Sequence, residues 1–208
     1  MNLLVKVYLL SPISGEIPMF DALMEWAILN KKNIITKNEK LNYECQLPLE
    51  KYNEVWKCSD AIIKTPDLVQ TNHIVSKFPS DDARLLKLDS RKSLLTASGA
   101  YKMRRKPLLA KLINCIAWFC EGDKVEIEKI LKKINSIGKC RNIGYGRIDT
   151  FDVQQIENDY SIFAGNVLMK TVPIEYINEN ITGYRKAIGS CTPPYWHPDN
   201  YREVAIPC

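Results

Sequence analysis

Residues 112–153, LINCIAWFCEGDKVEIEKILKKINSIGKCRNIGYGRIDTFDV, carry the clearest folding signals in the chain. The segment opens with a nearly unbroken apolar run, residues 112–119, which predicts a central strand buried on both faces. Asp123 can then accept hydrogen bonds from the free N–H groups of a helix, with Glu126 completing a capping box. Apolar residues recur at helical spacing and predict a helix that ends at Gly138; this stripe consists of Ile127, Ile130, Leu131 and Ile134.

A similar order of elements precedes this segment. Residues 3–9 are rich in branched and aromatic side chains and predict a buried strand. Pro18 opens a helix whose apolar residues keep helical spacing, and a short strand is expected within 55–63. With a strand at 147–153, the chain has the order strand, helix, strand twice. This order favours an α+β, ferredoxin-like (RRM-like) sandwich.

The last third continues this body with less regular signals. Residues 166–174 predict a further strand. Residues 191–198 contain three prolines, which disfavour a helix or a central strand. We therefore expect one domain over residues 1–208, in which 175–208 form an irregular C-terminal extension.

Composition limits the class of protein. Of the 208 residues, 46% are hydrophobic and 25% charged, as in soluble globular proteins. The longest apolar runs are far shorter than the roughly 20 residues that span a bilayer, and no secretory leader is evident, so we expect a cytoplasmic protein without membrane contact. The seven cysteines are scattered and form no closely spaced pair. We expect neither a metal nor a cofactor.

Positive charge concentrates in the middle of the chain. Residues 1–76 carry 8 basic and 9 acidic groups, residues 77–147 carry 17 and 7, and residues 148–208 carry 4 and 8. One-sided clustering of this kind is typical of nucleic-acid binding, although a solvated basic edge would give the same pattern. No strong period holds over 69–107, where 85–88 and 93–96 could be the arms of an extended hairpin. We interpret 69–107 as a basic projection inserted into the domain.

The glycine-rich loop 138–147 follows the capped helix and precedes a strand. It holds three glycines and three cations in ten residues. Glycine allows positive φ and close backbone approach, so the loop's N–H groups could form a nest for phosphate oxygens. The equal alternative is a tight turn that needs glycine only for packing. The loop lacks the Gly-Lys-Ser/Thr ending of nucleotide hydrolases, which disfavours mononucleotide binding.

The chain resembles the RAMP superfamily of CRISPR-associated proteins, whose signature is such a G-loop after the last helix of a ferredoxin-like fold; residues 137–148 match it. It also resembles the five-prime-handle-binding subunit of type IV effector complexes, through PMFDAL at 18–23, LPL at 47–49, GAYK at 99–102 and PPYWHP at 193–198. These motifs span nearly the whole chain.

The resemblance implies a palm with an inserted basic thumb hairpin, here 69–107. It implies a non-catalytic subunit of a CRISPR ribonucleoprotein that binds and caps the 5′ handle of the crRNA. Its partners would be the crRNA, the backbone RAMP subunit and the large subunit, while contact with target DNA near the protospacer stays open. With the charge pattern, the RNA-binding candidates are Lys77, Arg91, Lys92, Tyr101, Lys102, Arg104, Arg105, Lys106, Gly138, Lys139, Arg141, Gly144, Tyr145, Gly146 and Arg147.

Two other functions stay open. Some RAMP relatives cleave precursor crRNA without a metal, usually with histidine as general acid or base. The chain has two histidines, and His73, expected in a loop at the start of the basic insertion, is the candidate for that role, while His197 is expected to be structural. Asp81 and Asp82 are better explained as turn formers than as magnesium ligands. A pure assembly protein would use its tryptophans for interfaces and would not bind RNA.

Overall fold

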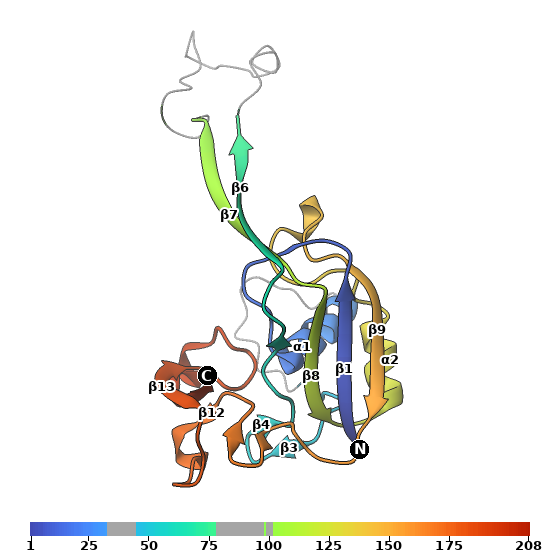
Figure 1. The fold of residues 1–208 in the computed structure, drawn as a ribbon, viewed down its shortest axis with the longest axis vertical. Coiled ribbons are helices and arrows are strands. Elements are labelled where there is room, and N and C mark those ends of the chain that lie inside the picture. The colour runs from blue at the N-terminus through green and yellow to red at the C-terminus, as the bar shows by residue number, and fades with distance from the viewer. Residues whose placement is uncertain (33–44, 78–97, 99–101) are drawn as a thin grey trace.

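A four-stranded antiparallel sheet forms the centre of the computed structural model, which describes residues 1–32, 45–77, 98 and 102–208 (Figure 1). The strand order is β5-β8-β1-β9. The order along the chain is strand, helix, strand, strand, helix, strand, so the α+β class is confirmed. These elements are β1 (Asn2–Leu9), α1 (Phe20–Lys32), β5 (Ile62–Ile63), β8 (Cys115–Glu121), α2 (Lys124–Leu131) and β9 (Ile148–Gln155).

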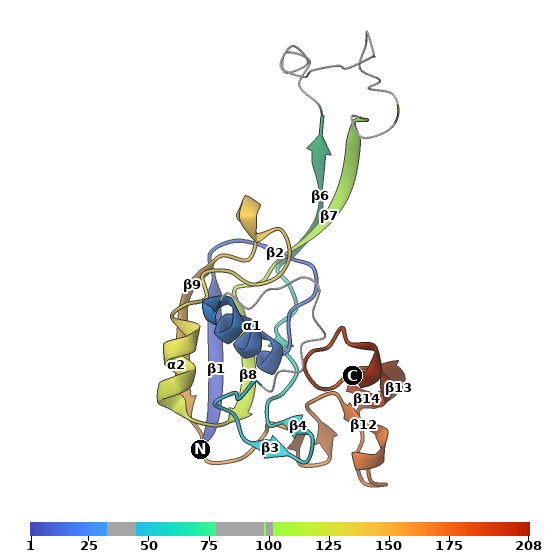
Figure 2. The same ribbon diagram turned by 180° about the vertical axis from the view of Figure 1, so that it is seen from behind.

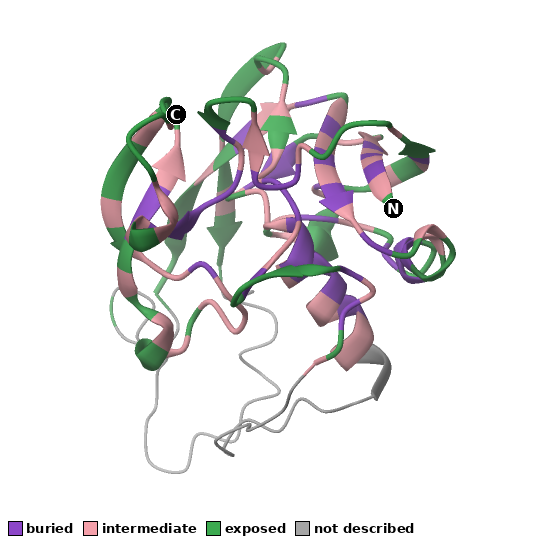
Figure 3. Ribbon diagram, turned by 90° about the horizontal axis from the view of Figure 1, so that it is seen from below, coloured by how far each residue is buried: buried purple, intermediate pink, exposed green. Residues whose placement is uncertain are grey.

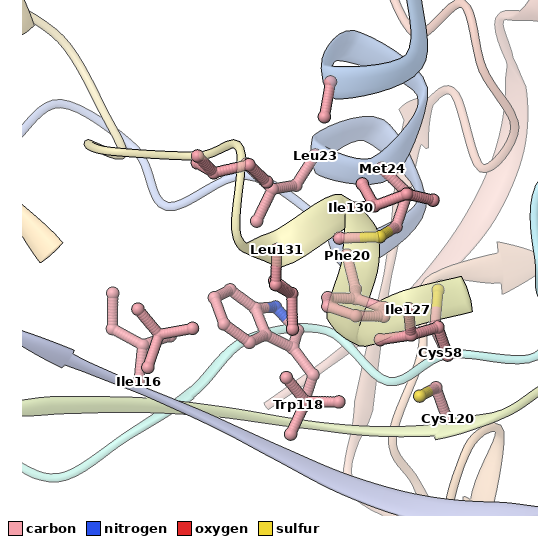
Figure 4. Packing of buried hydrophobic residues seen from close by; sticks show 14 of the residues in the cluster. Phe20, Leu23, Met24, Cys58, Ile116, Trp118, Cys120, Ile127, Ile130 and Leu131 are labelled. Atoms are coloured by element: carbon pink, nitrogen blue, oxygen red, sulfur yellow. The ribbon is translucent and has the colours of Figure 1, made fainter. Parts of the chain in front are cut away.

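Both helices cover the same face of this sheet (Figure 2). Alternate residues of β1 and β8 are buried against them, as the period of two in a strand requires. The rings of Phe20 from α1 and Trp118 from β8 lie 5.6 Å apart at the centre of this core (Figure 4). The predicted stripe of α2 is buried with them. Packing between the helices and one sheet face therefore fixes the body.

The start of α2 and its cap by Asp123 are as predicted, but the capping box and the end of the helix differ from the prediction. The Asp123 carboxylate accepts from the N–H groups of Val125 and Glu126. The capping box is wrong, because Glu126 pairs with Lys129 and the Asp123 N–H donates to the carbonyl of Pro48. The helix ends at Leu131 rather than Gly138. The chain leaves the helix because residues 135–137 pair with the far end of the glycine-rich loop and the start of β9, where the Ile137 N–H donates to the Gly146 carbonyl over 2.8 Å.

The predicted strand 112–119 is two strands. One ends at Leu112 and β8 begins at Cys115, and the Asn114 carbonyl between them accepts from the Leu9 N–H. Burial on both faces is also wrong: in β8 one face is buried and the other is intermediate. The strand expected within 55–63 is likewise divided, because between its two ends only an isolated bridge, Cys58 with Cys120, continues the pairing. Its parts are β4 (Val55–Trp56), which pairs with β3 (Lys51–Tyr52), and β5.

A long hairpin projects from the body (Figures 1 and 2). Its arms are β6 (Leu68–Ser76) and β7 (Arg104–Leu112). At its base β7 also pairs with β2 (Ile13–Ser14), giving a sheet of order β2-β7-β6. The arms predicted at 85–88 and 93–96 lie outside the described residues.

The C-terminal part has regular structure and a hydrophobic core of its own, so the prediction of an irregular extension is wrong. A three-stranded sheet of order β12-β14-β13 buries Val172, Val204 and Ala205. Buried segments near the C-terminus are purple in Figure 3. Residues 191–197 form neither helix nor strand, as expected. The elements are β10 (Phe163–Ala164), β11 (Val167–Leu168), β12 (Val172–Pro173), η4 (Ile174–Tyr176), β13 (Tyr184–Gly189), η5 (Pro198–Asn200) and β14 (Arg202–Pro207).

The single strand predicted at 166–174 is interrupted between β11 and β12. There the Met169 carbonyl accepts from the Asp60 N–H, and the Asp60 carboxylate accepts from both the N–H and the hydroxyl of Thr171. These long-range bonds replace a strand ladder at this point. None of the helices formed by the described residues is long and apolar enough to cross a membrane.

Candidate nucleic-acid interface

The outer end of the hairpin carries three consecutive cations. Arg104, Arg105 and Lys106 begin β7 and pair with residues 74–76 of β6 in antiparallel register. Because side chains alternate along a strand, Arg105 lies on one face while the other two lie on the opposite face. All three are exposed. The hairpin therefore presents positive charge on both faces.

These cations have no acidic partner in the described part of the chain. Lys77 and Lys102 extend the basic end of the hairpin, and both are exposed. None of the five appears in an ion pair with a described carboxylate. Toward the described part of the chain, these charges can bind an external polyanion without first breaking a salt bridge.

His73 lies on β6 rather than in a loop, opposite Pro107. The prediction of a loop was wrong because backbone pairing between β6 and β7 continues through residues 69–76, where the sequence shows no regular apolar pattern. His73 is exposed, and its Nδ1 lies 3.2 Å from an Nη atom of Arg105. An imidazole and a guanidinium therefore share one face of the hairpin.

The glycine-rich loop is a tight left-handed turn around η3 (Arg141–Ile143). Positive φ occurs at Gly138, Cys140, Gly144 and Gly146. A Cβ on Gly146 would lie 1.8 Å from the Ile137 carbonyl oxygen, and a Cβ on Gly138 would lie 2.7 Å from that of Ser14. Packing thus requires glycine at these two positions. Gly144 is exposed, and a Cβ there would meet nothing within 4 Å.

The three cations of the loop are exposed on its surface. The stem of Lys139 packs against Gly15. The guanidinium carbon of Arg141 lies 4.4 Å from the ring centroid of Trp26, a cation–π contact that orders this side chain. Arg147 follows at the end of the loop. Among the residues described, no carboxylate pairs with any of these three.

The structure brings the loop and the base of the hairpin together. Asn72 of β6 donates to the Tyr145 hydroxyl over 2.8 Å. Ser14 of β2 pairs with β7, and its carbonyl accepts from the Lys139 N–H over 2.7 Å. Tyr145 is half-buried at this junction, so it joins the two segments rather than standing free. We call the combined exposed cations the basic surface: Lys77, Lys102, Arg104, Arg105, Lys106, Lys139, Arg141 and Arg147.

Three RNA-binding candidates, Arg91, Lys92 and Tyr101, lie outside the described residues, as do Asp81 and Asp82. Sequence reasoning missed Trp26 and Asn72. Trp26 had a usable signal, since it is an aromatic residue beside the apolar stripe of its helix rather than in it. Asn72 had none, because its partner Tyr145 is 73 positions away.

A buried polar cluster joins the C-terminal part to α1. The Lys170 ammonium is fully buried, 3.2 Å from an Asp21 carboxylate oxygen and 3.4 Å from the Cys58 sulfur. The Tyr195 hydroxyl donates to the same oxygen of Asp21 over 2.6 Å. These contacts connect four segments that are far apart in the sequence.

Electrostatics within this cluster favour one charged pair and two neutral groups. Burial lowers the pKa of Lys170, but Asp21, Cys58 and Asp60 outweigh it and leave that pKa above its ordinary value. Burial raises the pKa of the Cys58 thiol to about 12 and, together with Asp21, that of Tyr195 well above its ordinary value. The cluster acts as a structural joint, and of its members only Tyr195 is partly exposed, where it lines a neighbouring cavity. In the described ranges, no three His, Cys, Asp or Glu side chains gather where a metal could bind.

Comparison with known proteins is consistent with this architecture. A search among curated proteins finds no match to this sequence. The family model of the CRISPR type IV associated protein Csf3 matches residues 2–207, which is nearly the whole chain and includes the body, the hairpin and the C-terminal sheet. The chain therefore belongs to the Csf3 family of CRISPR type IV associated proteins, and its partners are other subunits of a CRISPR complex.

Proposed function

We propose that this protein is a non-catalytic subunit that holds the guide RNA of a type IV CRISPR effector complex by its phosphate backbone. The observation that carries the proposal is the basic surface: eight exposed cations from the hairpin and the loop, with no acidic partner among the described residues. A chain that belongs to a CRISPR family and presents such a surface has crRNA as its natural polyanion. The repeat-derived 5′ handle is the segment we propose it caps.

The proposed architecture is a RAMP palm with a basic thumb. The sheet order β5-β8-β1-β9, with both helices on one face, supports a ferredoxin-like palm. The hairpin of β6 and β7 leaves the body between β5 and β8, which supports assigning residues 69–107 to an inserted thumb within one domain. The large and backbone subunits are the proposed neighbours.

A second function, metal-independent cleavage of precursor crRNA, is favoured by one contact. The Arg105 guanidinium lies beside the His73 imidazole, so a base or acid and a phosphate-binding cation are adjacent. Both side chains are exposed, however, and neither lines the cavities that the described residues form beside α1, α2 and the ends of the central sheet. Binding the RNA backbone without cleaving it does not require a phosphodiester to be held in one orientation.

Binding and cleavage of labelled repeat RNA separate the alternatives. The gripping function predicts tighter binding of the RNA of the CRISPR repeat than of a shuffled RNA of equal length, and no specific product. Specific products that disappear in His73→Ala, with binding retained, would establish the nuclease instead. If neither RNA binds, even when the other effector subunits are present, the protein serves assembly only.

A further inference from the structure

An open cavity of about 540 Å³ lies between the start of α1 and the glycine-rich loop. Its walls are mainly apolar, formed by Ile17, Met19, Leu23 and Trp26. Lys139 and Arg141 stand at its rim, and both are exposed. The cavity therefore joins the basic surface directly, with apolar walls beneath two cations.

This combination matches a nucleotide better than an apolar ligand or a bare anion. A flat base gains from leaving water for an apolar wall, while its phosphate gains from the cations at the rim. Single-stranded RNA is generally held in this manner, through unstacked bases and backbone charge. Glu16 also borders the cavity. Because the Glu16 carboxylate would repel a phosphate, we expect the phosphate to bind beside Lys139 and Arg141.

Arg141 is already ordered for such a role. Its guanidinium lies over the Trp26 ring at 4.4 Å, so part of the ordering cost of this side chain is met before any ligand arrives. A stacked guanidinium keeps its N–H groups at its edge, where they can donate to phosphate oxygens. Trp26 is half-buried and fixes Arg141 at the rim.

We propose that this cavity captures one unstacked base of the bound RNA, while Lys139 and Arg141 hold the adjoining phosphate. The inference rests on the proposed function, because it assigns a base-binding site to the same RNA. It adds a contact that depends on the base at one nucleotide to a grip that otherwise depends on phosphates.

An abasic scan tests this inference with two variants. Repeat RNAs, each with a single abasic nucleotide, are titrated against the wild type. Trp26→Leu removes the aromatic wall and the support of Arg141. Ala22→Leu fills the cavity from α1 with a good helix former, and Ala22 is a half-buried lining residue outside the core. Thermal unfolding of both variants checks the fold.

One abasic position is expected to weaken wild-type binding by about 5-fold or more, the size of a base–aromatic stacking contact. In both variants intact RNA should bind as weakly as that abasic RNA does to the wild type, with no further loss from the lesion. Wild-type binding that no abasic position affects would overturn the base site while leaving the phosphate grip intact. The base site would also be overturned if one abasic position weakened binding of the wild type and weakened binding of Ala22→Leu by the same factor. Absence of any binding of intact RNA would overturn the proposed function itself.

Discussion

The buried lysine at position 170 and the exposed cations of the hairpin differ in both burial and pairing with acidic groups. Lys170 is completely buried, and Asp21, Cys58 and Tyr195 surround it in one hydrogen-bonded cluster. Arg104, by contrast, is exposed and has no acidic partner in the described residues. Lys170, whose charge is paired inside the protein, stabilises the fold. Arg104, whose charge pairs with no described carboxylate, is available to bind a partner.

Replacing the buried lysine gives the largest expected effect. Lys170→Met leaves the Asp21 carboxylate buried without its counter-charge, which typically costs about 3–5 kcal/mol. Urea unfolding measures the loss. The double variant Asp21→Asn/Lys170→Met should recover part of it, because neither partner is then charged. A single variant as stable as the wild type would show that the cluster does not join the two parts.

Tyr195 tests the same joint from the C-terminal side with a smaller change. Tyr195→Phe removes the hydroxyl that donates to Asp21 over 2.6 Å but keeps the ring. A hydrogen bond to a charged group contributes about 1.5–3 kcal/mol. Unfolding in urea should show a loss within that range. Tyr160→Phe, which removes another tyrosine hydroxyl that accepts an exposed hydrogen bond, is the matched control and should change stability little.

The pH dependence of Asp60 gives a smaller effect with a defined sign. Burial raises the pKa of Asp60 above its ordinary value, and one of its carboxylate oxygens is buried without a hydrogen-bond partner among the described residues. Because the folded state binds this proton more tightly than the unfolded state, its stabilising contribution is present in acid and is lost as the pH rises through the raised pKa.

Asp60→Asn cannot titrate, so the melting temperature of the variant relative to the wild type should rise between about pH 4 and about pH 7. Melting curves at both pH values measure this difference. A constant difference would mean that Asp60 titrates in the folded protein as it does in the unfolded chain.

The smallest expected effect on stability belongs to the hairpin. Arg104→Ala, Arg105→Ala and Lys106→Ala remove exposed charges that pair with no carboxylate among the described residues, and each should change the free energy of unfolding by less than about 0.5 kcal/mol. Guanidinium unfolding of the triple variant checks this. A large loss would place these residues with Lys170 as structural charges and would remove the contrast on which the proposed function depends.

Local signals predicted local structure well. The branched and aromatic run of β1, the stripe of α1 and the Asp123 cap each depend on residues a few positions apart. Features decided by long-range pairing were missed. The Gly146 carbonyl shortens α2 from across the loop, and Asp60 interrupts the expected strand at 166–174 from more than a hundred positions away.

For the candidate nucleic-acid interface too, features set by nearby residues were predicted and features set by long-range contacts were missed. Charge clustering found the cations of the basic surface, because composition alone reveals them. The contact between the loop and the hairpin could not be found, since it depends on the Asn72–Tyr145 bond and on the pairing of β2 with β7. Lys170, the one cation within the apolar stretch 167–173, was a signal for a buried partner. The sequence could not show that its partner would be the carboxylate of Asp21, 149 positions away.

The salt dependence of RNA binding tests the central claim most directly. Dissociation constants for repeat RNA are measured across a salt series for the wild type and two variants. The hairpin variant is Arg104/Arg105/Lys106→Ala, and the control is Lys124/Lys129/Lys132→Ala, which removes the same charge from α2 and its C-terminal cap. If the basic surface grips the backbone, the hairpin variant alone binds more weakly, and its slope of log affinity against log salt is shallower by about 2, as expected for three lost phosphate contacts. Equal weakening and equal slopes in the two variants would contradict the account, because the RNA would then respond only to net charge.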